Sequence, residues 1–183
     1  RLPVLRIVVL AATALGLTCR GPGAGAATPP NDDLAGAVVI GSLPFEHRAD
    51  IQGAGVEPDE RLSECSGSTN VSVWYRFTAT TALRLVLDTR GSSFDTVLSV
   101  WTGQAHPLTE VACSDDSGTT PEGETDLTSE VRLTVPAGVT VHVRIDGYFD
   151  APTAAWDLVL SATAGAGGAA NDDHASATPI SVL

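Results

Sequence analysis

Oxygen-bearing side chains cluster at three places in this 183-residue chain, and they are the groups best suited to chemistry. The first cluster is residues 31–33, the second lies at residues 57–64, and the third begins with Asp115 and Asp116. Calcium takes about six to eight oxygen ligands from carboxylates, amides and carbonyls. Asp115 and Asp116 are therefore candidate calcium ligands. The same residue types also accept backbone N–H bonds in turns and at helix starts, so both interpretations stay open.

Catalytic motifs are absent from the sequence. It contains no His-Glu-x-x-His, no Gly-x-Ser-x-Gly and no Walker loop. Its four histidines have no pair at metal-ligand spacing: His47, His106, His142 and His174. We therefore predict that the chain is not an enzyme. A catalytic triad need not be local in sequence, so a hydrolase with a non-local site remains the alternative.

Two aromatic residues are candidates for contact with a ligand. Tyr148 and Phe149 follow a glycine in an expected loop, where exposed rings stack on sugars or contact protein. The three tryptophans are expected to pack in a core that has few other large fillers. Four arginines occupy polar positions of expected strands and are predicted to form a charged solvent face if their strands share a sheet. They are Arg76, Arg84, Arg132 and Arg144.

The formal net charge is -12, and all ten basic residues are arginine. Such a surface repels phosphate backbones and anionic membranes, so we expect no nucleic-acid partner. It is compatible with hard cations.

The first 26 residues are typical of a secretory signal peptide. Arg1 and Arg6 flank or precede the apolar run Ile7–Leu17, and Ala24–Ala26 fits a small-x-small cleavage site. The run is too short to span a bilayer, so we expect no transmembrane segment in the mature chain. Lipidation of Cys19 is the alternative to simple cleavage. Either way the protein is predicted to be secreted or held at the cell surface.

The two remaining cysteines are Cys65 and Cys113. In an exported chain they are predicted to form a disulfide, with two unrelated buried thiols as the competing interpretation. A bridge closing a loop of this length stabilises a fold by about 3–4 kcal/mol in the chain-entropy model.

Alternation of apolar and polar residues dominates the middle of the chain and is typical of half-buried antiparallel strands. The alternating runs are Ser72–Thr78, Leu83–Asp88, Val131–Val135, Val139–Asp146 and Trp156–Ser161. Further strands are expected at Ala37–Leu43, His47–Gln52, Thr96–Trp101 and Glu110–Cys113. About nine short strands separated by turn signals predict an all-β fold, a two-sheet antiparallel β-sandwich.

A sequence segment near the start of the chain recurs in similar form at its end. NDDLAGAVVIGSL begins at Asn31, and NDDHASATPISVL begins at Asn171 after a stretch rich in Gly and Ala. We assign the sandwich to residues 30–162, a linker to 163–170 and the start of a second, similar domain to 171–183.

Several phrases resemble the bacterial pre-peptidase C-terminal domain family. Their order and spacing together are more specific than any one of them. The phrases are Asn31–Ala35 with Ala37, Ser72–Thr78, Phe94–Gly103, Cys113–Gly118 and Ile145–Tyr148.

This resemblance spans about Pro30 to Ala162 and implies a jelly-roll-like β-sandwich that is not itself catalytic. The family's domains are appended to secreted hydrolases, especially proteases, or occur in tandem on surface proteins. Some relatives bind calcium through the opening Asn-Asp and a later acidic loop, which points to Asn31, Asp32 and Asp59. Others bind collagen or other insoluble substrates.

Together these observations predict an exported accessory module that acts as a spacer, a stabilising domain or an adhesion or substrate-targeting domain of a larger protein. The alternative is a calcium-dependent module that binds an extracellular polymer or protein. Calcium is the one candidate cofactor, and the expected partners are neighbouring domains, extracellular proteins or polysaccharides.

Overall fold

Strands form at each of the nine expected places in the part of the chain that the computed structural model describes, residues 27–66, 71–119, 123–148 and 156–165. In chain order the elements are the 3-10 turn η1 (Leu34–Gly36) and the strands β1 (Val38–Ile40), β2 (Phe45–Asp50), β3 (Ser72–Thr78), β4 (Leu83–Asp88), β5 (Thr96–Thr102), β6 (Thr109–Ser114), β7 (Gly118–Thr119), β8 (Thr125–Asp126), β9 (Glu130–Val135), β10 (Thr140–Gly147) and β11 (Asp157–Ala164).

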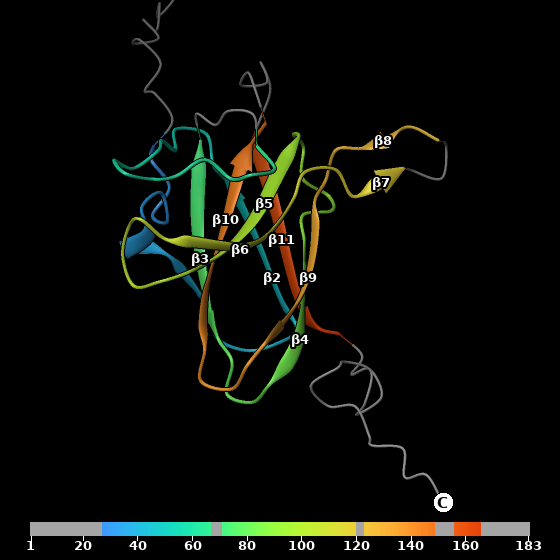
Figure 1. Ribbon diagram of the computed structural model, residues 1–183. Helices are drawn as coiled ribbons and strands as arrows, with labels where there is room; N and C mark the ends of the chain where they lie inside the picture. Colours follow the sequence, from blue (N-terminus) through green and yellow to red (C-terminus); the bar gives the residue numbers. More distant parts are fainter. Residues whose placement is uncertain (1–26, 67–70, 120–122, 149–155, 166–183) are drawn as a thin grey trace, which may run out of the picture.

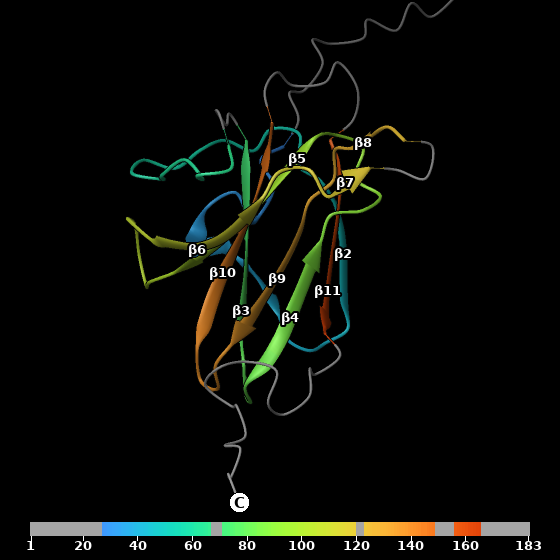
Figure 2. The same cartoon turned by 45° about the vertical axis from the view of Figure 1, so that its right-hand side comes forward.

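Two large sheets face each other, which confirms the predicted all-β sandwich (Figure 1). One sheet has the strand order β1-β3-β10-β5-β6 and the other β2-β11-β4-β9. After a rotation of 45° the two sheets are seen side by side (Figure 2). One pair departs from the antiparallel expectation, because β1 runs parallel to β3. The small pair β7-β8 was not expected, since strands of two residues are too short to show alternation.

The main core lies between the sheets and is built from the apolar residues of the alternating runs. Val73, Tyr75 and Phe77 of β3 point into it, and Leu158 and Leu160 of β11 do so from the opposite sheet. Trp156, which precedes β11, packs its ring 4.8 Å from that of Phe94. Core packing of Trp156 is therefore confirmed.

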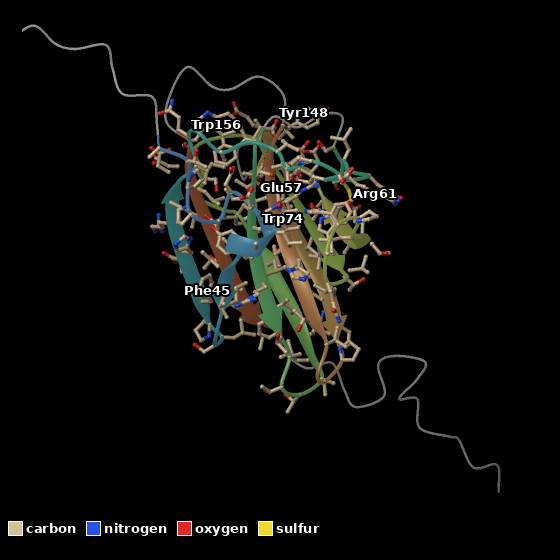
Figure 3. The ribbon with its side chains drawn as sticks, turned by 90° about the vertical axis from the view of Figure 1, so that its left-hand side faces the viewer. Phe45, Glu57, Arg61, Trp74, Tyr148 and Trp156 are labelled. Atoms are coloured by element: carbon tan, nitrogen blue, oxygen red, sulfur yellow. A yellow bond between two sulfur atoms is a disulfide. The ribbon has the colours of Figure 1, made fainter. Side chains whose placement is uncertain are left out.

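A second, smaller core lies on the outer side of the five-stranded sheet. Trp74, Trp101 and Leu108 are 2% exposed or less there, although Trp74 occupies what alternation marks as the polar face of β3. The reason is a covering layer made of η1 and residues 51–66. Figure 3 views this side of the molecule, with Glu57 and Trp74 lying close together over the sheet.

Arg144 of β10 is fully buried in this second core, so the predicted solvent face of four arginines is wrong for it. Its guanidinium lies 5.6 Å from the ring centroid of Trp74 and 4.8 Å from that of Trp101. It forms ion pairs with Asp146 at 2.9 Å and with Glu60 at 3.2 Å.

The other three arginines of that predicted face are exposed but lie on both sheets. Arg76 is on β3, whereas Arg84 and Arg132 are on the paired strands β4 and β9. They therefore form no single stripe.

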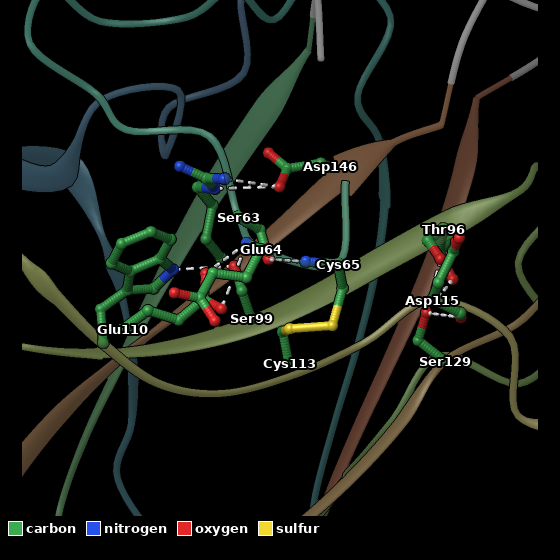
Figure 4. The surroundings of a disulfide bond; sticks show 12 residues. Ser63, Glu64, Cys65, Thr96, Ser99, Glu110, Cys113, Asp115, Ser129 and Asp146 are labelled. Carbon is green, nitrogen blue, oxygen red and sulfur yellow. Dashed lines mark hydrogen bonds and ion pairs between the residues drawn. A yellow bond between two sulfur atoms is a disulfide. The ribbon is translucent and has the colours of Figure 1, made fainter. Parts of the chain in front are cut away.

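The predicted disulfide is confirmed and ties the covering layer to β6. Cys65 and Cys113 are bonded, with their Cα atoms 5.9 Å apart (Figure 4). Close by, the backbone N–H of Glu64 donates to the Glu110 carboxylate at 3.3 Å. The bridge and this bond hold the end of the layer against an edge strand.

The expected boundary between sandwich and linker needs correction. β11 continues to Ala164, because Thr163 and Ala164 pair with Val86 and Leu85 through backbone bonds that need no large side chain. The rest of the linker, the signal peptide at 1–26, the repeated phrase at 171–183 and Phe149 lie outside the described residues. The described residues contain no helix with the length and apolar character needed to span a membrane.

Gly147 at the end of β10 is predicted to tolerate no side chain. A Cβ atom there would lie 2.2 Å from Cζ3 and 2.5 Å from Cη2 of Trp156, whose ring is buried in the core. We expect Gly147→Ala to lower the free energy of unfolding by about 1–3 kcal/mol, measured from urea denaturation.

Gly41→Ala is the matched control, since its added Cβ would have no atom within 4 Å. Its effect should stay within about 0.5 kcal/mol. Equal stabilities of the two variants would contradict the packing described for Trp156.

Candidate functional site

Three carboxylates meet at one corner of the sandwich. Asp95, Asp115 and Asp116 each offer an oxygen within 4.8 Å of the others. Among the described residues this is the one group of three or more acidic, histidine or cysteine side chains that comes so close together. The structure thus brings the two residues predicted at the third acidic cluster into contact with a third that was not predicted.

Backbone contacts fix this acidic corner, which we define as Asp95, Asp115 and Asp116. Asp95 immediately precedes β5, and Asp115 immediately follows β6, its antiparallel partner. The hydroxyl of buried Ser129 lies within hydrogen-bond distance of the backbone oxygens of Thr96 and Asp115, as Figure 4 shows. The backbone N–H of Tyr148 donates to the Asp95 carbonyl at 3.0 Å. The ends of several strands therefore hold the corner in place.

The carboxylates of the acidic corner are poorly neutralised. Burial raises the pKa of Asp95 to about 6, and the charges of Asp115 and Asp116 add to the shift. Burial also raises the pKa of Asp115, again with help from Asp116. Oδ1 of Asp95 and Oδ1 of Asp115 are both buried, and neither has a hydrogen-bond partner among the described residues.

Asp95 stands at the entry of β5, and its Oδ1 accepts no hydrogen bond from the described residues. The backbone carbonyl of Asp95 accepts the N–H of Tyr148, while its carboxylate lies near those of Asp115 and Asp116.

A hard cation suits this donor set. Three carboxylates supply between three and six of the roughly six to eight oxygens that calcium takes. A bound cation would also offset the mutual repulsion that raises the pKa of Asp95 and would give the two buried oxygens a partner.

The other predicted calcium ligands lie elsewhere. Asn31 is 1% exposed, its side-chain amide donates to the Trp74 carbonyl at 3.1 Å, and its own carbonyl accepts the Trp74 N–H at 2.8 Å. Asp32 accepts the N–H of Gly55 at 2.5 Å. Asp59 is exposed, with a positive φ of 67°. The contacts of Asn31 and Asp32 fasten the opening segment to β3 and to the covering layer.

The N-terminus of η1 is capped by a residue that is distant in the sequence. Asp33 occupies the N-cap position but makes no side-chain cap bond. Glu57 instead accepts the N–H of Leu34 at 2.6 Å. This contact links the opening segment to the covering layer a second time.

The described histidines are not part of the acidic corner. Each described histidine bonds to a group that is neither serine nor cysteine: His47 to Tyr75 at 3.0 Å, His106 to Glu57 at 3.2 Å and His142 to the Gly103 carbonyl at 3.2 Å. His174 lies outside the described residues. Tyr148, predicted to face a ligand, is intermediate in exposure.

Comparison with solved structures finds several matches, and two of them are of similar extent. The pre-peptidase C-terminal domain of collagenase from Bacillus anthracis is 11% identical, with a TM-score of 0.42, and the match covers 70% of this chain and 94% of that one. The periplasmic inhibitor of g-type lysozyme, PliG, from Aeromonas hydrophila is 11% identical, with a TM-score of 0.41, and the match covers 70% and 96%. The first is a domain of the family that the sequence phrases resemble.

No protein-family model and no curated protein matches the sequence. The β-sandwich fold rests on the strand pairing of this chain itself.

The raised pKa of Asp95 predicts how stability depends on pH in calcium-free buffer. Because the folded-state pKa of about 6 lies above the ordinary value of 3.8, the folded protein holds this proton more tightly than the unfolded chain. The Asp95 contribution to the free energy of unfolding should therefore fall as pH rises from about 4 to 6.

Urea midpoints of the wild type and of Asp95→Asn across this range isolate the effect. The difference between them should move in favour of the variant as pH rises. Parallel profiles would show that Asp95 is not perturbed.

Proposed function

We propose that the chain is a non-catalytic β-sandwich accessory module of a larger exported protein, stiffened by a calcium ion at the acidic corner. The observation that supports this most is the acidic corner itself, where two buried carboxylate oxygens lack a partner. A surface turn formed only for its backbone geometry has no need to bury such oxygens.

Export is supported by the Cys65–Cys113 disulfide. Such bonds persist in oxidising compartments and are rare in reducing ones. The signal-peptide pattern of residues 1–26 points the same way.

A non-catalytic role is favoured by how the reactive side chains are used. The imidazoles of His47, His106 and His142 bond to a phenol, a carboxylate and a carbonyl, and none of these bonds is to the hydroxyl of a serine or the thiol of a cysteine. The module would then act on its neighbours, as a spacer, as a stabilising domain or as a domain that targets an extracellular protein or polysaccharide.

Calcium at the acidic corner would act mainly on stability. The corner joins the start of β5, the end of β6 and, through Ser129, the start of β9. A cation held there would tie strands of both sheets at one end of the sandwich, because β5 and β6 belong to one sheet and β9 to the other.

The test is thermal unfolding of chelator-treated protein with and without calcium. At a calcium concentration about 100-fold above the dissociation constant, linkage gives about 2.7 kcal/mol. For a domain of this size we therefore expect the melting temperature to rise by about 5–10 °C and then to level off. The double variant Asp115→Asn, Asp116→Asn should lose this rise.

Asp59→Asn is the control, because Asp59 is acidic, exposed and remote from the acidic corner in the chain. It should keep the wild-type rise. No shift up to millimolar calcium would remove the metal from the proposal, and a shift lost only in Asp59→Asn would move the site to the 57–64 loop.

A further inference from the structure

The register of the five-stranded sheet places five residues in one row across its outer face. Val39 of β1 pairs with Arg76 of β3, and Arg76 pairs with His142 of β10. His142 pairs in turn with Trp101 of β5, which pairs with Glu110 of β6. Since paired residues point to the same side of a sheet, this row lies directly below the row that contains Trp74 and Arg144.

The covering layer closes the upper row and leaves part of the lower row open. Trp74 and Arg144 are fully buried, whereas Arg76 is exposed and Val39 is 53% exposed. The next polar pair down, Thr78 and Thr140, is exposed too, with its hydroxyls 2.8 Å apart.

An open concavity of about 520 Å³ lies over this part of the face. More than half of its lining surface is polar, and the residues that line it are Arg76, Gly103, Gln104, Gly138, Thr140 and His142. The volume falls within the range of about 300–1,000 Å³ that is usual for small-ligand sites.

Arg76 is a cation without an ion-pair partner among the described residues of a strongly acidic chain. Arg48, Arg90 and Arg132 each form an ion pair with a glutamate. Arg76 forms no ion pair or side-chain hydrogen bond with the described residues, although acids outnumber arginines in the sequence by 22 to 10.

His142, which pairs with Arg76 in the row, is further evidence that the local charge here is positive. Burial lowers the pKa of His142, the positive charge of Arg76 lowers it further, and no carboxylate of the described residues offsets these effects. Nδ1 of His142 is buried and has no hydrogen-bond partner among those residues. Nε2–H of the neutral ring donates to the Gly103 carbonyl, so Nδ1 is an acceptor, and the group of this row that lacks an acceptor is the guanidinium of Arg76.

We propose that this concavity binds the carboxylate of an acidic sugar, with Arg76 as the residue that pairs with it. This names a ligand class for the substrate-targeting role proposed above and rests on that role, but it uses no residue of the acidic corner.

Three features favour an acidic sugar. A guanidinium presents parallel N–H donors that match one carboxylate. The net charge of -12 would repel a polyanion, whereas a single carboxylate among neutral hydroxyls meets only the local positive charge. Gln104 and Thr140 offer the amide and hydroxyl groups that bond sugar hydroxyls, and the lining contains no large apolar side chain to hold a peptide residue.

The experiment is a two-dimensional NMR titration of the whole chain with D-glucuronate, using D-glucose as the neutral counterpart. Glucuronate should cause saturable shifts of the Arg76 Nε–H signal and of the amides of Gly138, Thr140 and His142, and glucose should cause none. Arg76→Gln should weaken glucuronate binding about tenfold or more, since a charge-assisted bond is lost. Arg76→Lys should retain part of the affinity.

Arg84→Gln is the matched control, because Arg84 is exposed, lies on the other sheet and has no ion pair among the described residues. It should bind as the wild type does. No saturable shift with glucuronate, equal shifts with glucose, or equal affinity in Arg76→Gln would overturn the site.

N-acetyl-alanyl-alanine is titrated as well, because it presents the carboxylate of a peptide instead of that of a sugar. Binding as tight as that of glucuronate would overturn the assignment to a sugar. All these results are independent of the calcium-dependent rise in melting temperature, so the two proposals fail separately.

Discussion

The burial of one guanidinium on the outside of a sheet organises much of this molecule. Transfer of a charge out of water costs several kcal/mol, so Arg144 is tolerable only with partners on every side. Asp146 comes from its own strand, the two indoles come from β3 and β5, and Glu60 must be delivered from the long connection between β2 and β3. A second layer over the sheet is therefore a requirement of the buried ion pairs.

Both proposed sites follow from that layer. Its end is bonded to β6 through Cys113, two residues before Asp115, so the anchor of the layer also steadies the acidic corner. The layer covers the row of Arg144 and leaves open the part of the next row that contains Arg76, where the concavity lies. The burial of Arg144 thus divides the outer face into a part that the layer covers and a part that is open to a ligand.

The sequence predicted the sandwich well because alternation reports directly which residues face the core. β3 and β4 begin and end where the alternating runs do. Alternation reports only the side on which a residue lies, however, and not whether another layer covers that side. Arg144 was for this reason assigned to a solvent face, and alternation alone places Trp74 on the polar side of β3, although core packing was expected for the tryptophans. In the same way Asp95 gave no sign of joining Asp115, since they meet only through the pairing of β5 with β6. The one available signal was its place just before a strand in a phrase shared with the resembled family.

The most direct test of the role of Arg144 compares its removal with that of an exposed arginine. Arg144→Met keeps a long side chain but leaves Asp146 and Glu60 buried without their cation, whereas Arg132→Met breaks only the exposed pair with Glu130. Urea denaturation should show a loss of about 3–5 kcal/mol for Arg144→Met, up to failure to fold, and of less than about 1 kcal/mol for Arg132→Met. A loss below about 1 kcal/mol in both variants would contradict the claim that the buried ion pairs hold the covering layer in place.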